Sequence, residues 1–159
     1  MSSLSGKVAV VTGASRGIGR GVALALADQG ATVYVTGRSV AADPHGLPGT
    51  VGATAAEVDH RGGTGIAVAV DHADDEQVAA LFDRVRHDHG RLDILVNNAF
   101  ALPDTLTEPE PFWRKPLSYW QMVDVGVRSN YVAAWHAAQM MVPQRSGLII
   151  ATSGYVGTT

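Results

Sequence analysis

"VVTGASRGIGR", residues Val10 to Arg20, is the stretch of sequence that decides the fold. A short apolar run ends in two valines, and Gly13, Gly17 and Gly19 then lead into a segment with helical spacing. Glycines here let the backbone turn tightly and leave amides free at a helix N-terminus, where the helix dipole attracts a phosphate. The spacing is G-x-x-x-G-x-G, unlike the G-x-G-x-x-G of most dinucleotide-binding folds, and no P-loop G-K-S/T follows. The stretch predicts a nucleotide-binding turn; the alternative is a turn that only packs a helix close to a strand.

The rest of the chain alternates between two kinds of apolar segment. Short runs rich in Val and Ile predict strands covered on both faces. These runs are Lys7–Val11, Thr32–Val35, Gly65–Val70, Leu92–Val96 and Leu148–Ala151. Longer stretches with helical spacing predict helices over Gly17–Gln29, Thr54–His60, Asp74–His89 and Pro116–Val142. Repeated strand–helix units predict an α/β fold, a Rossmann-type doubly wound parallel sheet with about five strands.

Two Pro-rich loops, Ser39–Gly49 and Phe100–Pro116, interrupt this alternation. In such a sheet ligands bind at the carboxyl ends of the strands, where both loops emerge. The second loop is longer than a plain connection needs to be, and loops of that kind are usually functional or mobile.

Composition limits the classes of protein and partner. The length of 159 residues predicts one domain, and with the glycine turn we expect a single, truncated dinucleotide-binding domain over residues 1–159. A net charge of −3 gives no reason to expect a nucleic-acid partner. The absence of Cys excludes disulfides and thiolate catalysis, and the six His residues do not form a metal set. The start "MSSLSGK" lacks a signal-peptide pattern, and no apolar run approaches the ~20 residues that span a bilayer. We therefore expect a cytoplasmic protein with no metal and no membrane partner.

The end of the second predicted strand indicates which dinucleotide would bind. Proteins that bind NAD generally place a carboxylate there for the ribose 2′-hydroxyl. This chain has "VTGRS" instead, with Arg38 and no acid, and Arg16 adds a second cation in the glycine turn. Two guanidinium groups suit a 2′-phosphate and favour NADP(H) over NAD(H). The alternative is that both are ordinary solvated loop arginines.

Two motifs resemble those of the short-chain dehydrogenase/reductase family. "TGASRGIG" at Thr12–Gly19 is similar to the family's cofactor motif, "DILVNNA" at Asp93–Ala99 is similar to its second motif, and Asp71 matches an acid placed near the adenine. The resemblance implies hydride transfer between NADP(H) and a small-molecule carbonyl or secondary alcohol. It also implies a homo-oligomer, a dimer or tetramer, in the full-length form, built largely through the long helix. The residues expected to bind the cofactor are Gly13, Ser15, Arg16, Gly17, Ile18, Gly19, Arg38, Asp71, His72, Asn98 and Ala99.

The catalytic residues that the resemblance implies are an Asn, a Ser, and a Tyr and Lys spaced Y-x-x-x-K. The Asn position falls on Gly126, and Asn130, one turn later on roughly the same face, is the alternative amide. The usual alignment places the Ser at Gly154, whereas a shift of one residue makes Ser153 the catalytic candidate. No Y-x-x-x-K occurs in the chain, so we expect the C-terminal part of the family fold to be missing and the chain to be weakly active or inactive alone. A non-catalytic nucleotide-binding relative, regulatory or degenerate, is the alternative function.

Phe100 is a further departure, because the family usually has Gly after "NNA". This aromatic ring either lines the nicotinamide pocket or packs the loop. Together with Gly126 it resembles the subgroup that dehydrogenase/reductase member 1 typifies.

Overall fold

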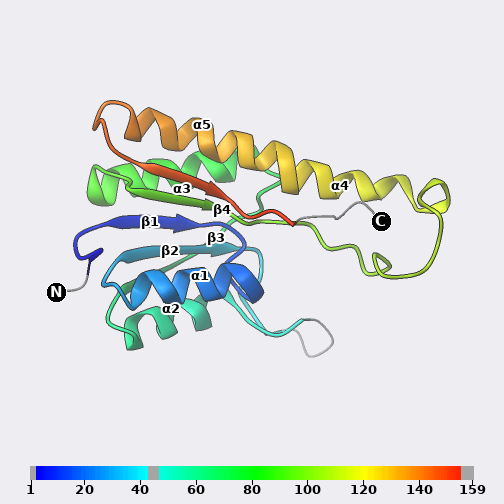
Figure 1. Ribbon diagram of the computed structural model, residues 1–159, viewed down its shortest axis with the longest axis horizontal. Helices are drawn as coiled ribbons and strands as arrows, with labels where there is room; N and C mark the ends of the chain where they lie inside the picture. The colour runs from blue at the N-terminus through cyan, green and yellow to red at the C-terminus, as the bar shows by residue number, and fades with distance from the viewer. Residues whose placement is uncertain (1–2, 43–46, 155–159) are drawn as a thin grey trace.

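The computed structural model describes residues 3–42 and 47–154, which contain one parallel β-sheet (Figure 1). Its five strands lie in the order β3-β2-β1-β4-β5. They are β1 (Val8–Val11), β2 (Thr32–Gly37), β3 (Thr64–Ala69), β4 (Ile94–Asn97) and β5 (Leu148–Ala151). The chain forms β1, then β2 and β3 on one side of it, and then returns to form β4 and β5 on the other side of β1. The prediction of a Rossmann-type, doubly wound parallel sheet is confirmed, and the reversal beside β1 is the place where such sheets bind ligands.

Helices cover both faces of the sheet (Figure 1). The helices α1 (Gly17–Ala27) and α2 (Val51–His60) lie on one face, and α3 (Asp75–His89) and α5 (Ser129–Met141) lie on the other. Each face has its own apolar core. Val10 of β1 belongs to the core that contains Phe82 of α3, whereas the next residue, Val11, belongs to the core that contains Leu24 of α1. This alternation along one buried strand is what a doubly covered parallel sheet requires.

Helix α2 begins three residues before the predicted Thr54. Thr50 caps it, because its Oγ1 accepts a hydrogen bond of 3.0 Å from the backbone amide of Ala53. Helix α1 ends at Ala27, two residues before the predicted Gln29. Both differences concern helix ends, where hydrogen bonds of single residues decide the boundary.

The prediction of a long helix over Pro116–Val142 is correct in extent, because helical residues run without a break from Leu117 to Met141, but this helix is not a regular α-helix (Figure 1). One 3₁₀ turn, η1 (Phe112–Arg114), precedes it. The helical run itself consists of a second 3₁₀ turn, η2 (Leu117–Tyr119), then α4 (Trp120–Val123), a π turn, η3 (Asp124–Arg128), and α5. Pro116 has an extended backbone and cannot lie within a helix. In the π turn, the side chains of Ser129 and Asn130 donate to the carbonyls of Val125 and Gly126, four residues earlier. Such side-chain bonds compete with the regular helical ladder and accompany its widening.

Burial differs from strand to strand. The expectation that strands are covered on both faces is correct for β1, β2 and β4 and wrong for the two edge strands, β3 and β5. Leu148, Ile149 and Ile150 of β5 are each at least 40% exposed, because described segments pair with this strand on one side only, through β4. Within residues 3–42 and 47–154, no helix has the length and apolar character needed to cross a membrane.

Candidate functional site

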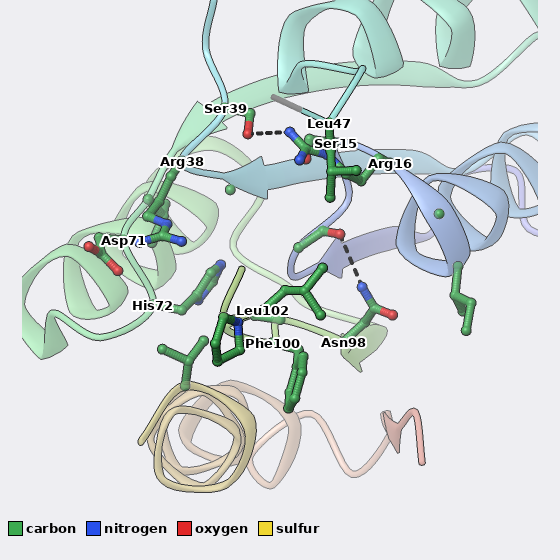
Figure 2. A pocket seen from close by; sticks show the side chains of 18 of the residues that line it. Ser15, Arg16, Arg38, Ser39, Leu47, Asp71, His72, Asn98, Phe100 and Leu102 are labelled. Carbon is green, nitrogen blue, oxygen red and sulfur yellow. Dashed lines mark hydrogen bonds between the residues drawn. The ribbon is translucent and has the colours of Figure 1, made fainter. Parts of the chain in front are cut away.

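A pocket of about 1020 Å³ lies at the carboxyl ends of the strands (Figure 2). Five segments line it: the glycine turn after β1, the loop after β2, the loop after β3, the loop after β4, and Val125 of the π turn. Every residue predicted to bind a cofactor lines this pocket except Gly19. These residues are Gly13, Ser15, Arg16, Gly17, Ile18, Arg38, Asp71, His72, Asn98 and Ala99.

The glycines of the turn have different physical roles. Gly13 (φ 64°) and Gly17 (φ 54°) both adopt a left-handed backbone that disfavours any side chain. A Cβ at Gly13 would lie 2.8 Å from the Cα of Ala99, and one at Gly19 would lie 2.4 Å from both the Gly13 carbonyl oxygen and Asn98 Nδ2. A Cβ at Gly17 would meet nothing within 4 Å. Gly13 and Gly19 thus serve close packing, whereas Gly17 leaves open space beside the first turn of α1.

That first turn can hold an anion. Arg16 is the N-cap of α1, and its side chain makes no capping hydrogen bond. The amides that follow it therefore have no side-chain acceptor, and the positive end of the helix dipole lies at the pocket.

Asn98 fixes the glycine turn against β4. Its Nδ2 donates to the carbonyls of Thr12 and Gly13 at 3.0 Å each, and the second of these bonds is drawn in Figure 2. In return, Thr12 Oγ1 accepts hydrogen bonds from the backbone amides of Asn98 (2.8 Å) and Ala99 (2.9 Å). Although Asn98 lines the pocket, its amide nitrogen is committed to holding the turn in shape.

Two arginines lie at the opening of the pocket (Figure 2). Arg16 Nη2 donates to Ser39 Oγ at 2.6 Å and to the carbonyl of Gly49 at 3.2 Å, while its Nε is buried without a partner in the described part of the chain. Arg38, which precedes Ser39, is exposed. The site therefore presents one guanidinium held in place by the loop after β2 and a second, exposed one that makes no hydrogen bond with the described residues.

His72 forms part of the pocket wall beside Asp71 (Figure 2). Its ring is 4% exposed, and its Nε2 lies 2.9 Å from Oγ1 of Thr36, which itself donates to the carbonyl of Val11. Burial lowers the pKa of His72 to about 4; Asp71 opposes this effect and Arg38 adds to it. The imidazole is therefore neutral near pH 7.

Phe100 both lines the pocket and packs against the π turn. A Cβ at Gly126 would lie 3.0 Å from Cδ2 of its ring, so these two departures from the family pattern fit each other. Asn130, the alternative amide, donates from Nδ2 to the Gly126 carbonyl at 2.8 Å and does not line the pocket. The backbone carbonyl of Asn130 accepts a hydrogen bond from Asn97 Nδ2 at 3.2 Å. The structure thus brings no amide side chain from this helix to the pocket.

Ser153 lies just beyond the end of β5 and is exposed. It does not line the pocket, and it makes no side-chain hydrogen bond with the described residues. Its neighbour Thr152 instead donates to Asn98 Oδ1 at 3.3 Å. No group of three or more His, Asp or Glu side chains in residues 3–42 and 47–154 is arranged to hold a metal ion.

Several pocket residues were not predicted from the sequence. They include Ser39, Leu47, Leu102, Leu106 and Val125. Ser39 follows Arg38 at the end of β2, so the rule that ligands bind at strand ends could have identified it. Val125 belongs to the π turn, which no periodicity in the sequence indicates.

Comparisons with known proteins agree with this geometry. The family model described as short chain dehydrogenase matches residues 7–159. Dehydrogenase/reductase SDR family member 1 of Mus musculus is 43% identical over 157 residues, which cover 96% of this chain and 48% of that protein. The resemblance to the family and to this subgroup is therefore confirmed, and the chain spans about half the length of that relative.

Solved structures share the fold. A metagenomic short-chain oxidoreductase in complex with NADP has a TM-score of 0.85 and 34% identity, covering 99% of this chain and 66% of that one. An NADH-dependent reductase complexed with NAD has a TM-score of 0.79 at 22% identity, covering 97% and 62%, and this likeness concerns the fold alone. Structures with either dinucleotide thus have this fold.

Proposed function

Because the chain belongs to the short-chain dehydrogenase family, we propose that it forms the cofactor-binding part of an NADP(H)-dependent oxidoreductase. The reaction is hydride transfer between the nicotinamide and a small-molecule carbonyl or secondary alcohol. The observation that carries the preference for NADP(H) is the pair of arginines, Arg16 and Arg38, that line the pocket. Arg16 also donates a hydrogen bond to Ser39 Oγ, which joins the glycine turn to the segment after β2. No carboxylate ends β2, where an NAD-binding chain would hold the ribose hydroxyl.

Each part of the cofactor has matching groups in the pocket. The free amides in the first turn of α1 bind the pyrophosphate, and the open space at Gly17 admits it. The guanidinium groups of Arg16 and Arg38 bind the 2′-phosphate, for which planar, forked donors are suited. Asp71 and neutral His72 border the adenine. The buried Nε of Arg16, which lacks a partner among the described residues, supports an acceptor at this place.

When bound, NADP(H) supplies or accepts the hydride. From this chain, Ser153 is proposed to hold the substrate oxygen by a hydrogen bond, since it follows β5 at the same edge of the sheet as the pocket. The 159 residues contain no Tyr-x-x-x-Lys, so they offer no candidate for the acid–base pair that the family resemblance implies.

One observation favours a second candidate, a nucleotide-binding relative without catalysis. The Asn position of the family is Gly126, and Phe100 fills the space beside it, so this position serves packing. Under this alternative the dinucleotide binds as proposed and no substrate is turned over.

The test measures the affinities of NADPH and NADH for the chain and for the double variant Arg16→Ala/Arg38→Ala. We expect NADPH to bind more tightly to the unaltered chain, and the double variant to lose at least about tenfold in NADPH affinity with little change for NADH. Arg20→Ala is the matched control, because Arg20 is an exposed arginine of α1 outside the pocket. An equal loss for both dinucleotides contradicts the 2′-phosphate assignment.

A second measurement separates the two candidate functions. NADPH oxidation is followed with a panel of ketones and aldehydes, using the chain and any longer natural form that contains it. Turnover by the longer form supports the oxidoreductase. Tight NADPH binding with no oxidation across the panel supports the non-catalytic relative.

A further inference from the structure

Arg128, in the π turn between α4 and α5, joins two parts of the chain that are distant in sequence. Its Nε donates to Asp124 in the same turn, and its Nη1 donates to Asp75 at the start of α3. Its Nη2 donates to the carbonyl of Ala73 at 2.9 Å. One guanidinium group thus contacts two carboxylates and a backbone carbonyl at once.

The segment that Arg128 reaches is the loop that carries Asp71 and His72 into the pocket. This loop is held together internally. Asp71 Oδ1 accepts from the Ala73 amide at 3.0 Å, and the Asp71 carbonyl accepts from the Asp74 amide at 3.0 Å. Because Ala73 is bonded directly to His72, a shift of its carbonyl moves the pocket wall. Fixing the Ala73 carbonyl therefore fixes the position of the loop as a unit.

The contact demands arginine rather than any cation. Three nitrogens of one planar group meet three acceptors, whereas a lysine has a single ammonium point and cannot span them. The hydrogen bonds to Asp124 and Asp75 raise the pKa of Arg128 above its usual range, so the group is charged wherever the protein is folded. An isolated exposed ion pair contributes little, but a bridge with three fixed acceptors determines relative position.

We infer that Arg128 is a positioning residue for the dinucleotide pocket: it holds the loop Asp71–Asp74 against the π turn and so sets the wall that faces the adenine. The inference rests on the proposed function for the identity of the ligand. The same π turn contributes Val125 to the pocket and places Gly126 against Phe100. The π turn therefore contacts both the loop after β3 and the loop after β4.

The test compares Arg128→Lys and Arg128→Ala with the unaltered chain. Arg86→Ala is the matched control, because Arg86 makes a 2.6 Å ion pair with Asp83 on the exposed side of α3, away from the pocket. The ligands are NADPH and adenosine 2′,5′-bisphosphate, which contains only the adenine end. Hydrogen exchange of the amides of Asp71, Ala73 and Asp74 reports on the loop itself, because all three amides are hydrogen-bonded.

We expect both Arg128 variants to bind both ligands about tenfold more weakly, by similar factors, because the loss lies at the adenine end. Exchange of the three loop amides should rise while the cores of the sheet stay protected, and Arg86→Ala should behave like the unaltered chain. Asp75→Asn, which weakens one of the three contacts, should give a smaller loss. Unaltered affinity and unaltered exchange in Arg128→Lys overturn the inference, as does exchange that rises uniformly along the chain.

Failure of the proposed function looks different. If the unaltered chain binds neither ligand, the NADP(H) assignment is wrong, and exchange of the three loop amides still decides whether Arg128 positions the loop.

Discussion

The buried imidazole of His72 should make the stability of the protein depend on pH. Burial lowers its pKa to about 4 in the folded protein, from an ordinary value of 6.5. The unfolded chain takes up a proton on this ring near pH 6.5, whereas the folded protein does so only near pH 4, so acidification between these values favours unfolding. Above pH 6.5 the ring is neutral in both states and adds no dependence on pH. At ~1.4 kcal/mol per pKa unit, the stability lost below the folded pKa is about 3 kcal/mol.

The assay is urea unfolding followed by circular dichroism, at intervals from about pH 7 to about pH 4.5. The quantity of interest is the difference in unfolding free energy between the unaltered chain and His72→Leu, because other groups titrate equally in both. This difference should change by about 2 kcal/mol over that range, to the disadvantage of the unaltered chain at low pH. His87→Gln is the control for removing an imidazole from the surface, since the side chain of His87 is 88% exposed.

Two results would refute this reasoning. One is a difference between the unaltered chain and His72→Leu that stays constant over the whole range. The other is a proton NMR resonance of the His72 ring that titrates near pH 6.5 in the folded protein, which would mean that burial does not hold the ring neutral.

Two further substitutions test the packing around the glycine turn and the π turn. In a Phe100→Ala background, Gly126→Ala should raise the free energy of unfolding by about 1 kcal/mol, because alanine favours the helical state. With Phe100 present the gain should be small, since the new methyl would lie 3.0 Å from the ring. If Gly126→Ala changes the free energy of unfolding equally in both backgrounds, the contact with Phe100 is contradicted. Asn98→Asp should be less stable than Asn98→Ala in urea unfolding, because a carboxylate would replace the donor that faces the carbonyls of Thr12 and Gly13. An Asn98→Asp variant as stable as the unaltered chain would refute the assigned hydrogen bonds.

The sequence was sufficient for the strands, the sheet and most of the pocket because these depend on local patterns. Each predicted apolar run overlaps an observed strand, as Lys7–Val11 does β1. The glycine turn could be predicted because it stands between a strand and a helix. The carboxyl ends of parallel strands meet at one edge of a sheet, so Arg38 and Asp71 could be assigned to one site before their positions were known.

The parts that sequence reasoning missed depend on distant or irregular contacts. The helix expected over Pro116–Val142 contains a π turn, which the hydrogen bonds of the Ser129 and Asn130 side chains accompany, and helical periodicity does not predict it. Arg128 meets the Ala73 carbonyl across 55 positions of sequence, which only the packing of α5 against α3 brings about. Burial of β5 was predicted from its apolar residues alone, but burial depends on neighbours that the described segments supply on one side only.

The bond between Thr12 and Asn98 joins residues that are 86 positions apart, and this has a consequence for how the protein is made. During synthesis the first strand and its glycine turn leave the ribosome long before β4, and the turn has no Asn98 to fix its carbonyls until that strand has emerged and docked. A dinucleotide that requires the fixed turn therefore recognises only chains whose central strands are already assembled. By mass action such a ligand withdraws those chains from the pool that can still unfold or misassemble. Under the proposed function, the dinucleotide would in this way favour newly made chains whose central strands are complete.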